Sequence, residues 1–102
     1  MKVSQVKAPR LSSQGIKILS AFTNAASAEL SGVDVHRRTG LASGTLYPIL
    51  MRFEEAGWLR SRWEAVDPRV EGRPRKRLYC VTASGIRAFQ DFVSAIGVMV
   101  TV

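Results

Sequence analysis

The sequence is poor in the side chains that bind metals and carry out catalysis. Its 102 residues include one histidine, His36, and one cysteine, Cys80. A conventional metal site needs about four spaced ligands of these types, so the sequence predicts no bound metal. A single cysteine also excludes an internal disulfide, which is typical of a protein of the reducing cytoplasm. We interpret His36 as an ordinary helix-surface residue and Cys80 as a packing residue.

Signatures of catalysis and of membrane insertion are lacking as well. The only paired carboxylates, Glu54 and Glu55, are adjacent on a predicted helix and therefore point apart. The chain has no phosphate-cradling glycine loop, so we predict that it is not an enzyme and needs no cofactor. Residues 1–10 contain no apolar run suited to a signal peptide, and no segment reaches the ~18 apolar residues of a membrane span. We expect a cytoplasmic protein with no membrane partner.

Positive charge is what the sequence has in excess. Fifteen Lys and Arg against eight Asp and Glu give a formal net charge of +7, and the pI is about 10.5. Such a balance favours an anionic partner, namely nucleic acid, acidic lipid or acidic protein. A charge that only maintains solubility is the alternative. The hydrophobic fraction of 46% supports a single folded domain with a modest core.

Hydrophobic periodicity predicts three helices in the first half of the chain. A helix that starts after Ser12-Ser13 and runs to about Ala25 carries apolar side chains at spacings of three and four. Ser31 and Asp34 form the pattern of a capping box for a second helix over 32–39. A third helix over 43–56 follows a tight turn, GLAS, which gives the outline of a helix-turn-helix.

The third helix contains a proline. The residues that share its predicted buried face are Leu46, Ile49, Leu50 and Phe53. An interior proline costs roughly 3 kcal/mol because it removes a backbone hydrogen bond. At about 100° per residue, Pro48 lies opposite the buried face. We therefore expect its ring to point outward, where it provides a donor-free surface for close approach to DNA.

After Gly57 the hydrophobic pattern changes to a period of two. This change predicts one strand over residues 58–64 and another over 75–82, with Tyr79 and Val81 on one face of the second strand. A turn-rich segment joins them. The sequence therefore predicts a two-stranded hairpin directly behind the third helix.

The last predicted helix carries a wide apolar arc and has Thr82 as its N-cap. The arc exceeds what a short helix needs against so small a core, so we expect a dimer interface formed with the first helix of a partner; packing onto the first three helices is the alternative. The predicted fold class is mostly α with a small β-hairpin. It comprises a basic arm over 1–11, a winged helix-turn-helix domain over 12–82 and a C-terminal dimerisation helix over 83–102.

Cationic residues cluster on the predicted hairpin and helix-turn-helix. They are Arg60, Arg62, Arg69, Arg73, Arg75, Lys76 and Arg77 on the hairpin and its turn, and Arg37, Arg38 and Arg52 on the helices. This density predicts a basic wing over 60–77 that neutralises DNA phosphates, with steep salt dependence. A solvated rim is the alternative.

Four motifs lie between Ser31 and Phe89: TGLASGTLYPIL, RFEEAGWLRSRWE, GRPRKRLYCVT and TASG. Together they resemble the PadR family of winged-helix transcriptional regulators. The resemblance implies a homodimeric DNA-binding repressor, and family members often respond to small aromatic compounds or hydrophobic drugs. The residues it implies at the DNA are Ser43, Gly44, Thr45, Tyr47 and Pro48 in the major groove, and Arg73, Arg75 and Lys76 on the wing.

The chain departs from the family pattern at three places. The family usually has Ser-Pro where this chain has Ala42-Ser43, so we expect Ser43 to cap the third helix and to shift its start by a residue. Val33 replaces a bulky aromatic residue. The short last helix lacks a tryptophan that lines the drug pocket in some members, and this departure bears on ligand binding more than on DNA binding.

Three functions follow as hypotheses. The first is a sequence-specific repressor of double-stranded DNA, with Thr45 and Tyr47 near base edges and Arg52 toward phosphate or guanine. The second is a sensor of small aromatic effectors. Its dimer cavity or interface would be formed by Phe22, Phe89, Phe92, Val93, Ile96 and Met99. The third is a protein-interaction module whose basic wing meets an acidic protein.

Overall fold

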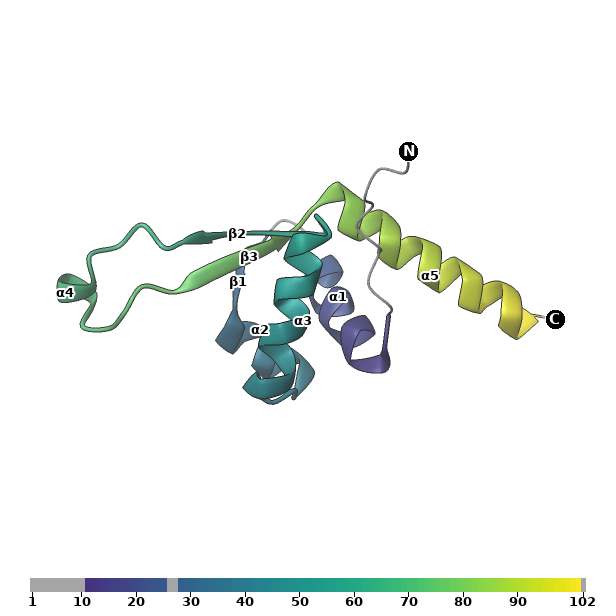
Figure 1. Ribbon diagram of the computed structural model, residues 1–102, viewed down its shortest axis with the longest axis horizontal. Coiled ribbons are helices and arrows are strands. Elements are labelled where there is room, and N and C mark those ends of the chain that lie inside the picture. Colours follow the sequence, from purple (N-terminus) through teal and green to yellow (C-terminus); the bar gives the residue numbers. More distant parts are fainter. Residues whose placement is uncertain (1–10, 26–27, 102) are drawn as a thin grey trace, which may run out of the picture.

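The chain folds into helices around a small antiparallel sheet, in a computed structural model that describes residues 11–25 and 28–101 (Figure 1). The elements in chain order are α1 (Ser13–Asn24), β1 (Leu30–Ser31), α2 (Gly32–Thr39), α3 (Ser43–Glu55), β2 (Leu59–Trp63), α4 (Pro68–Glu71), β3 (Arg77–Val81) and α5 (Ala83–Thr101). The predicted basic arm falls, except for residue 11, outside the described residues. The mostly helical fold class is confirmed.

The first two helices begin at side-chain caps. Ser12 Oγ accepts a hydrogen bond from the Gly15 N–H at 3.1 Å, which starts α1. At α2, the Asp34 N–H donates to Ser31 Oγ at 3.2 Å and the Ser31 N–H donates to Asp34 Oδ2 at 2.9 Å. These two bonds are the predicted capping box, and each satisfies a backbone donor that the first turn of a helix leaves free.

The start of α3 differs from the expectation for Ser43. The N–H groups of Thr45 and Leu46 both donate to the Ala42 carbonyl, at 3.0 and 2.9 Å, so Ala42 is the N-cap residue. Ser43 is already the first helical residue, and the prediction that it caps the helix is wrong. Alanine carries no side-chain acceptor. The first-turn N–H groups of α3 therefore face outward without a side-chain cap from the N-cap residue.

Beyond its start, α3 follows the predicted pattern. The buried side chains are Leu46, Ile49, Leu50 and Phe53. Pro48 lies within the helix and is exposed, as predicted. The chain leaves the helix through Gly57, whose φ of 78° is a conformation that side chains other than glycine adopt rarely.

The sheet has a third strand that the sequence analysis missed. Its order is β1-β3-β2, with both pairings antiparallel. Leu30 pairs with Tyr79 in one ladder, and Leu59 pairs with Val81 in the other. β1 is only two residues long, so it has no periodicity from which it could be predicted. The segment 64–76 between β2 and β3, here called the wing loop, contains the one-turn helix α4, which was also not predicted.

The core lies between α1, α2, α3 and one face of the sheet. Its members are Ile18, Leu19, Phe22, Leu30, Val35, Leu46, Ile49, Leu50, Phe53, Trp58, Leu59, Tyr79 and Val81. Phe22 is fully buried here. The prediction that Phe22 lines an effector cavity or a dimer interface is therefore wrong for this chain, because α1 turns that side chain into the protein's own core.

α5 is attached to the core at its first turn. Thr82 Oγ1 donates to the Gly57 carbonyl at 2.6 Å and accepts from the Gly85 N–H at 3.1 Å, which confirms Thr82 as the cap. The Thr82 N–H also donates to the Trp58 carbonyl at 3.0 Å. The first half of α5 packs against the core through Ile86, Ala88 and Phe89, and the helix then projects away from the body, on the side opposite the wing loop (Figure 1). In the described part of the chain, no helix is both long and apolar enough to cross a bilayer.

Candidate nucleic-acid interface

The outer face of α3 is open along its length. Its exposed residues include the predicted major-groove set, Ser43, Gly44, Thr45, Tyr47 and Pro48, and further along Met51 and Arg52. A Cβ added at Gly44 would stand in open space within the described structure. Pro48 contributes no N–H, so this face lacks one backbone donor near its centre. The arrangement allows close approach of another surface to the first two turns of α3.

Tyr47 is the largest side chain on this face, and it does not stand free. Its ring reaches across to α2, where the phenol packs against Gly32. The exposed fraction of Tyr47 is 42%. Tyr47 therefore lies along the surface between α2 and α3 and joins the two helices of the helix-turn-helix.

The wing loop is closed at its base by one acidic residue. The Glu64 carboxylate accepts hydrogen bonds from both terminal nitrogens of Arg73, at 2.8 and 3.1 Å, and from the backbone N–H of Lys76, at 3.1 Å. The hydrogen bonds from Arg73, followed by that from Lys76, lower the pKa of Glu64 to about 2. Arg73 was predicted as a phosphate contact. The structure places it instead in the ion pair that closes the loop.

Arg75 and Lys76 are exposed residues of the wing loop. Arg75 Nε donates to the Val66 carbonyl at 2.8 Å, which holds the side chain against the wing loop. Both residues line a pocket of about 470 Å³, here called the wing groove. The residues that line it are Ser31, Gly32, Val33, Tyr47, Trp63, Arg75, Lys76, Arg77 and Tyr79. The wing groove thus brings a predicted recognition residue of α3 together with the predicted cations of the wing.

Arg77 serves a different role from its neighbours. Its guanidinium lies 5.0 Å from the centre of the Trp63 ring, Nε donates to Ser61 Oγ at 3.0 Å, and Nη2 is 3.9 Å from Glu54 Oε2. These contacts join β3 to β2 and to the end of α3. Arg77 is half-buried, so it forms the floor of the wing groove and is not a projecting contact.

Two further arginines of β2 share one face of the sheet. Arg60 and Arg62 alternate with Ser61, whose hydroxyl bonds Glu54 of α3, and therefore point to the face away from α3. Arg62 makes a two-point pair there with Glu29, at 2.6 and 2.7 Å. The hydrogen bonds from Arg62 lower the pKa of Glu29. This pair lies outside the surface formed by α3 and the wing groove.

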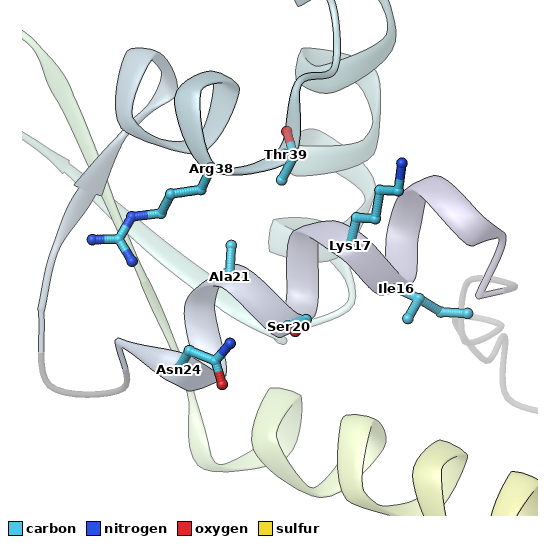
Figure 2. A pocket seen from close by; sticks show the side chains of 7 residues that line it. All are labelled: Ile16, Lys17, Ser20, Ala21, Asn24, Arg38 and Thr39. Carbon is cyan, nitrogen blue, oxygen red and sulfur yellow. The ribbon is translucent and has the colours of Figure 1, made fainter.

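The basic residues at the end of α2 lie in different surroundings. His36 Nδ1 donates to the Leu41 carbonyl at 2.6 Å and so stabilises the turn between α2 and α3. Arg37 is exposed on α2. Arg38 extends from α2 on the side of α1, where it lines a pocket of about 530 Å³ together with Ala21 and Asn24 (Figure 2). The structure therefore separates Arg38 from the wing groove, and of the two arginines only Arg37 remains in the proposed interface.

α5 carries the remaining predicted set. Phe89 is half-buried against the core, and Phe92 is half-buried further along the helix. Val93 and Ile96 are exposed, with 50% and 42% of their surface accessible. Met99 lies outside the residues whose side chains are described. The effector cavity stays a prediction.

Comparison with protein families identifies the chain. Residues 14–91 match the transcriptional regulator PadR-like family. The chain belongs to this family. The match spans α1 to α5 and includes the helix-turn-helix and the wing loop, so the resemblance predicted from the four motifs is confirmed. The family is one of transcriptional regulators, which also confirms that the chain is not an enzyme.

Solved structures share the fold. A PadR family transcriptional regulator from Eggerthella lenta matches with a TM-score of 0.69 and 18% identity, over 85% of this chain and 77% of that one. Bordetella bronchiseptica BpsR, solved for its regulation by 6-hydroxynicotinic acid, gives 0.71 and 20%, over 90% and 60%. Bacillus subtilis PadR in complex with operator DNA gives 0.62 and 21%, over 76% and 46%. The search of curated proteins returned no match. The PadR-like chain thus has the winged-helix fold of these proteins.

Sequence reasoning missed two residues of this PadR-like surface. The period-two pattern includes Glu64 in a predicted strand, although a carboxylate within a strongly cationic segment is also a signal for an internal ion pair. Gly32 was read only as the first residue of a helix. Its contact with Tyr47 joins residues of two separate helices, and no local pattern reports it.

Proposed function

We propose that the chain is a homodimeric DNA-binding repressor, with α3 in the major groove and the wing on the phosphate backbone. In this proposal residues 12–82 form the DNA-binding unit and residues 83–102 the dimerisation helix. Ser43, Gly44, Thr45 and Pro48 approach base edges, while Arg37, Arg52, Arg75 and Lys76 approach phosphates.

One observation carries the proposal. The wing groove brings Tyr47 of α3 and the exposed Arg75 and Lys76 of the wing loop onto one continuous surface. In a winged helix-turn-helix, base contacts come from the recognition helix and phosphate contacts come from the cations around it. The net charge of +7 gives this surface the sign that DNA requires.

The proposed dimer rests on the exposed side of α5. Val93 and Ile96 are three residues apart and share one face of the helix, and Phe92 adjoins them. A helix that projects from the body with exposed apolar side chains is stabilised when a second copy covers them. Two-fold symmetry would present two recognition helices to the two halves of a palindromic site.

Selection of bound duplexes from a random library tests both parts. The proposal predicts enrichment of an inverted repeat whose half-sites are about one helical turn, ~10 base pairs, apart. The variant Ile96→Glu should sediment as a monomer and lose the preference for two half-sites. Arg87→Glu, an exposed change near the start of the same helix, is the matched control and should leave both unchanged. If the selection enriches no particular sequence at physiological salt, the proposal is contradicted.

A further inference from the structure

Gly32 and Tyr47 meet where α2, α3 and the wing come together. Gly32 is buried at the first position of α2, and Tyr47 reaches it from the second turn of α3. A Cβ placed on Gly32 would lie 2.6 Å from Tyr47 Cζ and 2.8 Å from Cε1, and would overlap Oη. Real Cβ atoms essentially never come within 3.0 Å of such atoms. Any side chain at position 32 would therefore displace the tyrosine ring.

Backbone geometry does not explain a glycine at this position. The described glycines with positive φ are Gly40, Gly57 and Gly72. Gly32 lies instead in the first turn of α2, in helical geometry that any residue adopts, and alanine is a better helix former than glycine. The three atoms nearest to an added Cβ all belong to the outer part of the Tyr47 ring, which is a movable side chain. The space that a side chain at position 32 would fill is therefore occupied by Tyr47.

The position of this ring shapes two neighbouring surfaces. On one side Tyr47 borders the wing groove, opposite Arg75 and Lys76. On the other side it borders a second pocket, of about 220 Å³, together with Val33, His36 and Ser43. Tyr47 lines both pockets, together with Gly32 and Val33. If the ring swung outward from Gly32, it would narrow the approach to the outer face of α3 and change both pockets at once.

We infer that Gly32 is a positioning residue for DNA binding. Its missing side chain lets the phenol end of Tyr47 rest against α2, and this sets the spacing between the outer face of α3 and the cations of the wing loop. The inference rests on the proposed function, because Tyr47 belongs to the proposed interface. Gly32 itself contacts Tyr47 and not the DNA.

A double-mutant cycle tests the inference. Gly32→Ala, Tyr47→Ala and the double variant are compared with the natural chain for their Kd toward a selected duplex and for their Tm. We expect Gly32→Ala to raise Kd by about tenfold, a coupling typical of residues in contact, and to lower Tm slightly. In the Tyr47→Ala background the same change should leave Kd unchanged and should leave Tm equal or higher. Gly15→Ala, at a buried helix position whose Cβ would approach Phe53 at 3.2 Å, is the control and should leave Kd unchanged.

The outcomes separate this inference from the proposed function. The inference is overturned if Gly32→Ala leaves Kd unchanged, or if it raises Kd equally with and without Tyr47. It is also overturned if Tyr47→Ala does not alter Kd, although DNA binding by the remaining residues would then stand. If the natural chain prefers no DNA sequence, the proposed function fails. The Tm values then still test the contact between Gly32 and Tyr47. The contact is supported only if Gly32→Ala lowers Tm when Tyr47 is present and does not lower it in the Tyr47→Ala background.

Discussion

Glu64 and Arg73 form a two-point ion pair across the base of the wing loop. Arg73 Nη1 lies 2.8 Å from Glu64 Oε1, and Nη2 lies 3.1 Å from Oε2. The backbone of Glu64 also donates to the Lys76 carbonyl at 2.8 Å, while the Lys76 N–H returns a bond to the carboxylate. Such charge-assisted bonds are stronger and more directional than neutral ones. Glu64 therefore joins the two ends of the wing loop. It also holds Arg73 inward, while Arg75 and Lys76 stay exposed.

The first prediction concerns pH. The hydrogen bonds from Arg73 and then from Lys76 lower the pKa of Glu64 from 4.5 to about 2 in the folded chain. A lowered pKa means that the pair stabilises the fold fully above about 4.5, and that this contribution is lost as the pH falls through about 2. NMR titration of the Glu64 carboxyl should give a midpoint near 2. In Arg73→Gln the midpoint should move toward the ordinary value. An ordinary midpoint in the natural chain would show that the pair does not form in solution.

The second prediction concerns the wing cations. Lys76→Gln should weaken binding to all DNA sequences by a similar factor and should reduce the slope of log K against log salt by about one, because one phosphate contact is lost. Anisotropy measurements at several salt concentrations give this slope. Arg87→Gln removes one charge near the start of α5, on the other side of the body, and should leave the slope unchanged. If Lys76→Gln has the same salt slope as the natural chain, Lys76 does not contact the DNA.

The third prediction concerns Pro48. Pro48→Ala restores a backbone N–H to α3 and removes a ring from its outer face, so the free energy of unfolding should rise or stay the same, by at most about 3 kcal/mol. DNA affinity should change in the same variant, because the ring lies on the proposed contact face. Urea unfolding and anisotropy measure the two effects. Lower stability with unchanged DNA binding would show that the proline serves the fold and not the interface.

The fourth prediction concerns the attachment of α5. A Cβ on Gly85 would overlap the Trp58 carbonyl oxygen and lie 2.8 Å from Val81 Cγ2. Because the first of these atoms is backbone, Gly85→Ala should cost about 1–3 kcal/mol of stability, as overpacking does. Gly44→Ala is the matched control on an exposed helix face, and it should stabilise the chain by up to about 1 kcal/mol. Equal stability of the two variants in urea would contradict the packing of α5 described above.

The fold was predictable where the determining contacts are local. Ser31 and Asp34 are three residues apart, and their capping box follows from that spacing alone. The alternation that places Tyr79 and Val81 on one face of β3 is likewise a local pattern. By contrast, Leu30 and Ser31 form a strand only because β3 offers them an edge. The two residues carry no periodic signal, and the tertiary pairing decides their structure.

The candidate site was predictable in composition but less so in the role of each residue. The cluster of arginines identified the wing, and the motif around Tyr47 identified the recognition helix. Which arginine is exposed depends on partners that are distant in sequence: Glu64 holds Arg73, and Trp63 and Ser61 hold Arg77. The position of the Tyr47 ring depends on the absence of a side chain at Gly32. These roles follow from the tertiary structure, which the spacing of residues does not report.

The central claim is that α3 and the wing groove bind DNA with sequence preference. The most direct test compares Kd for a selected duplex with Kd for a scrambled duplex of the same length, at physiological salt and across a salt series. The account predicts a preference of at least about 10³-fold for the selected duplex, and a steep salt dependence for both duplexes. Equal affinities for the two duplexes, or an affinity that does not change with salt, would contradict it.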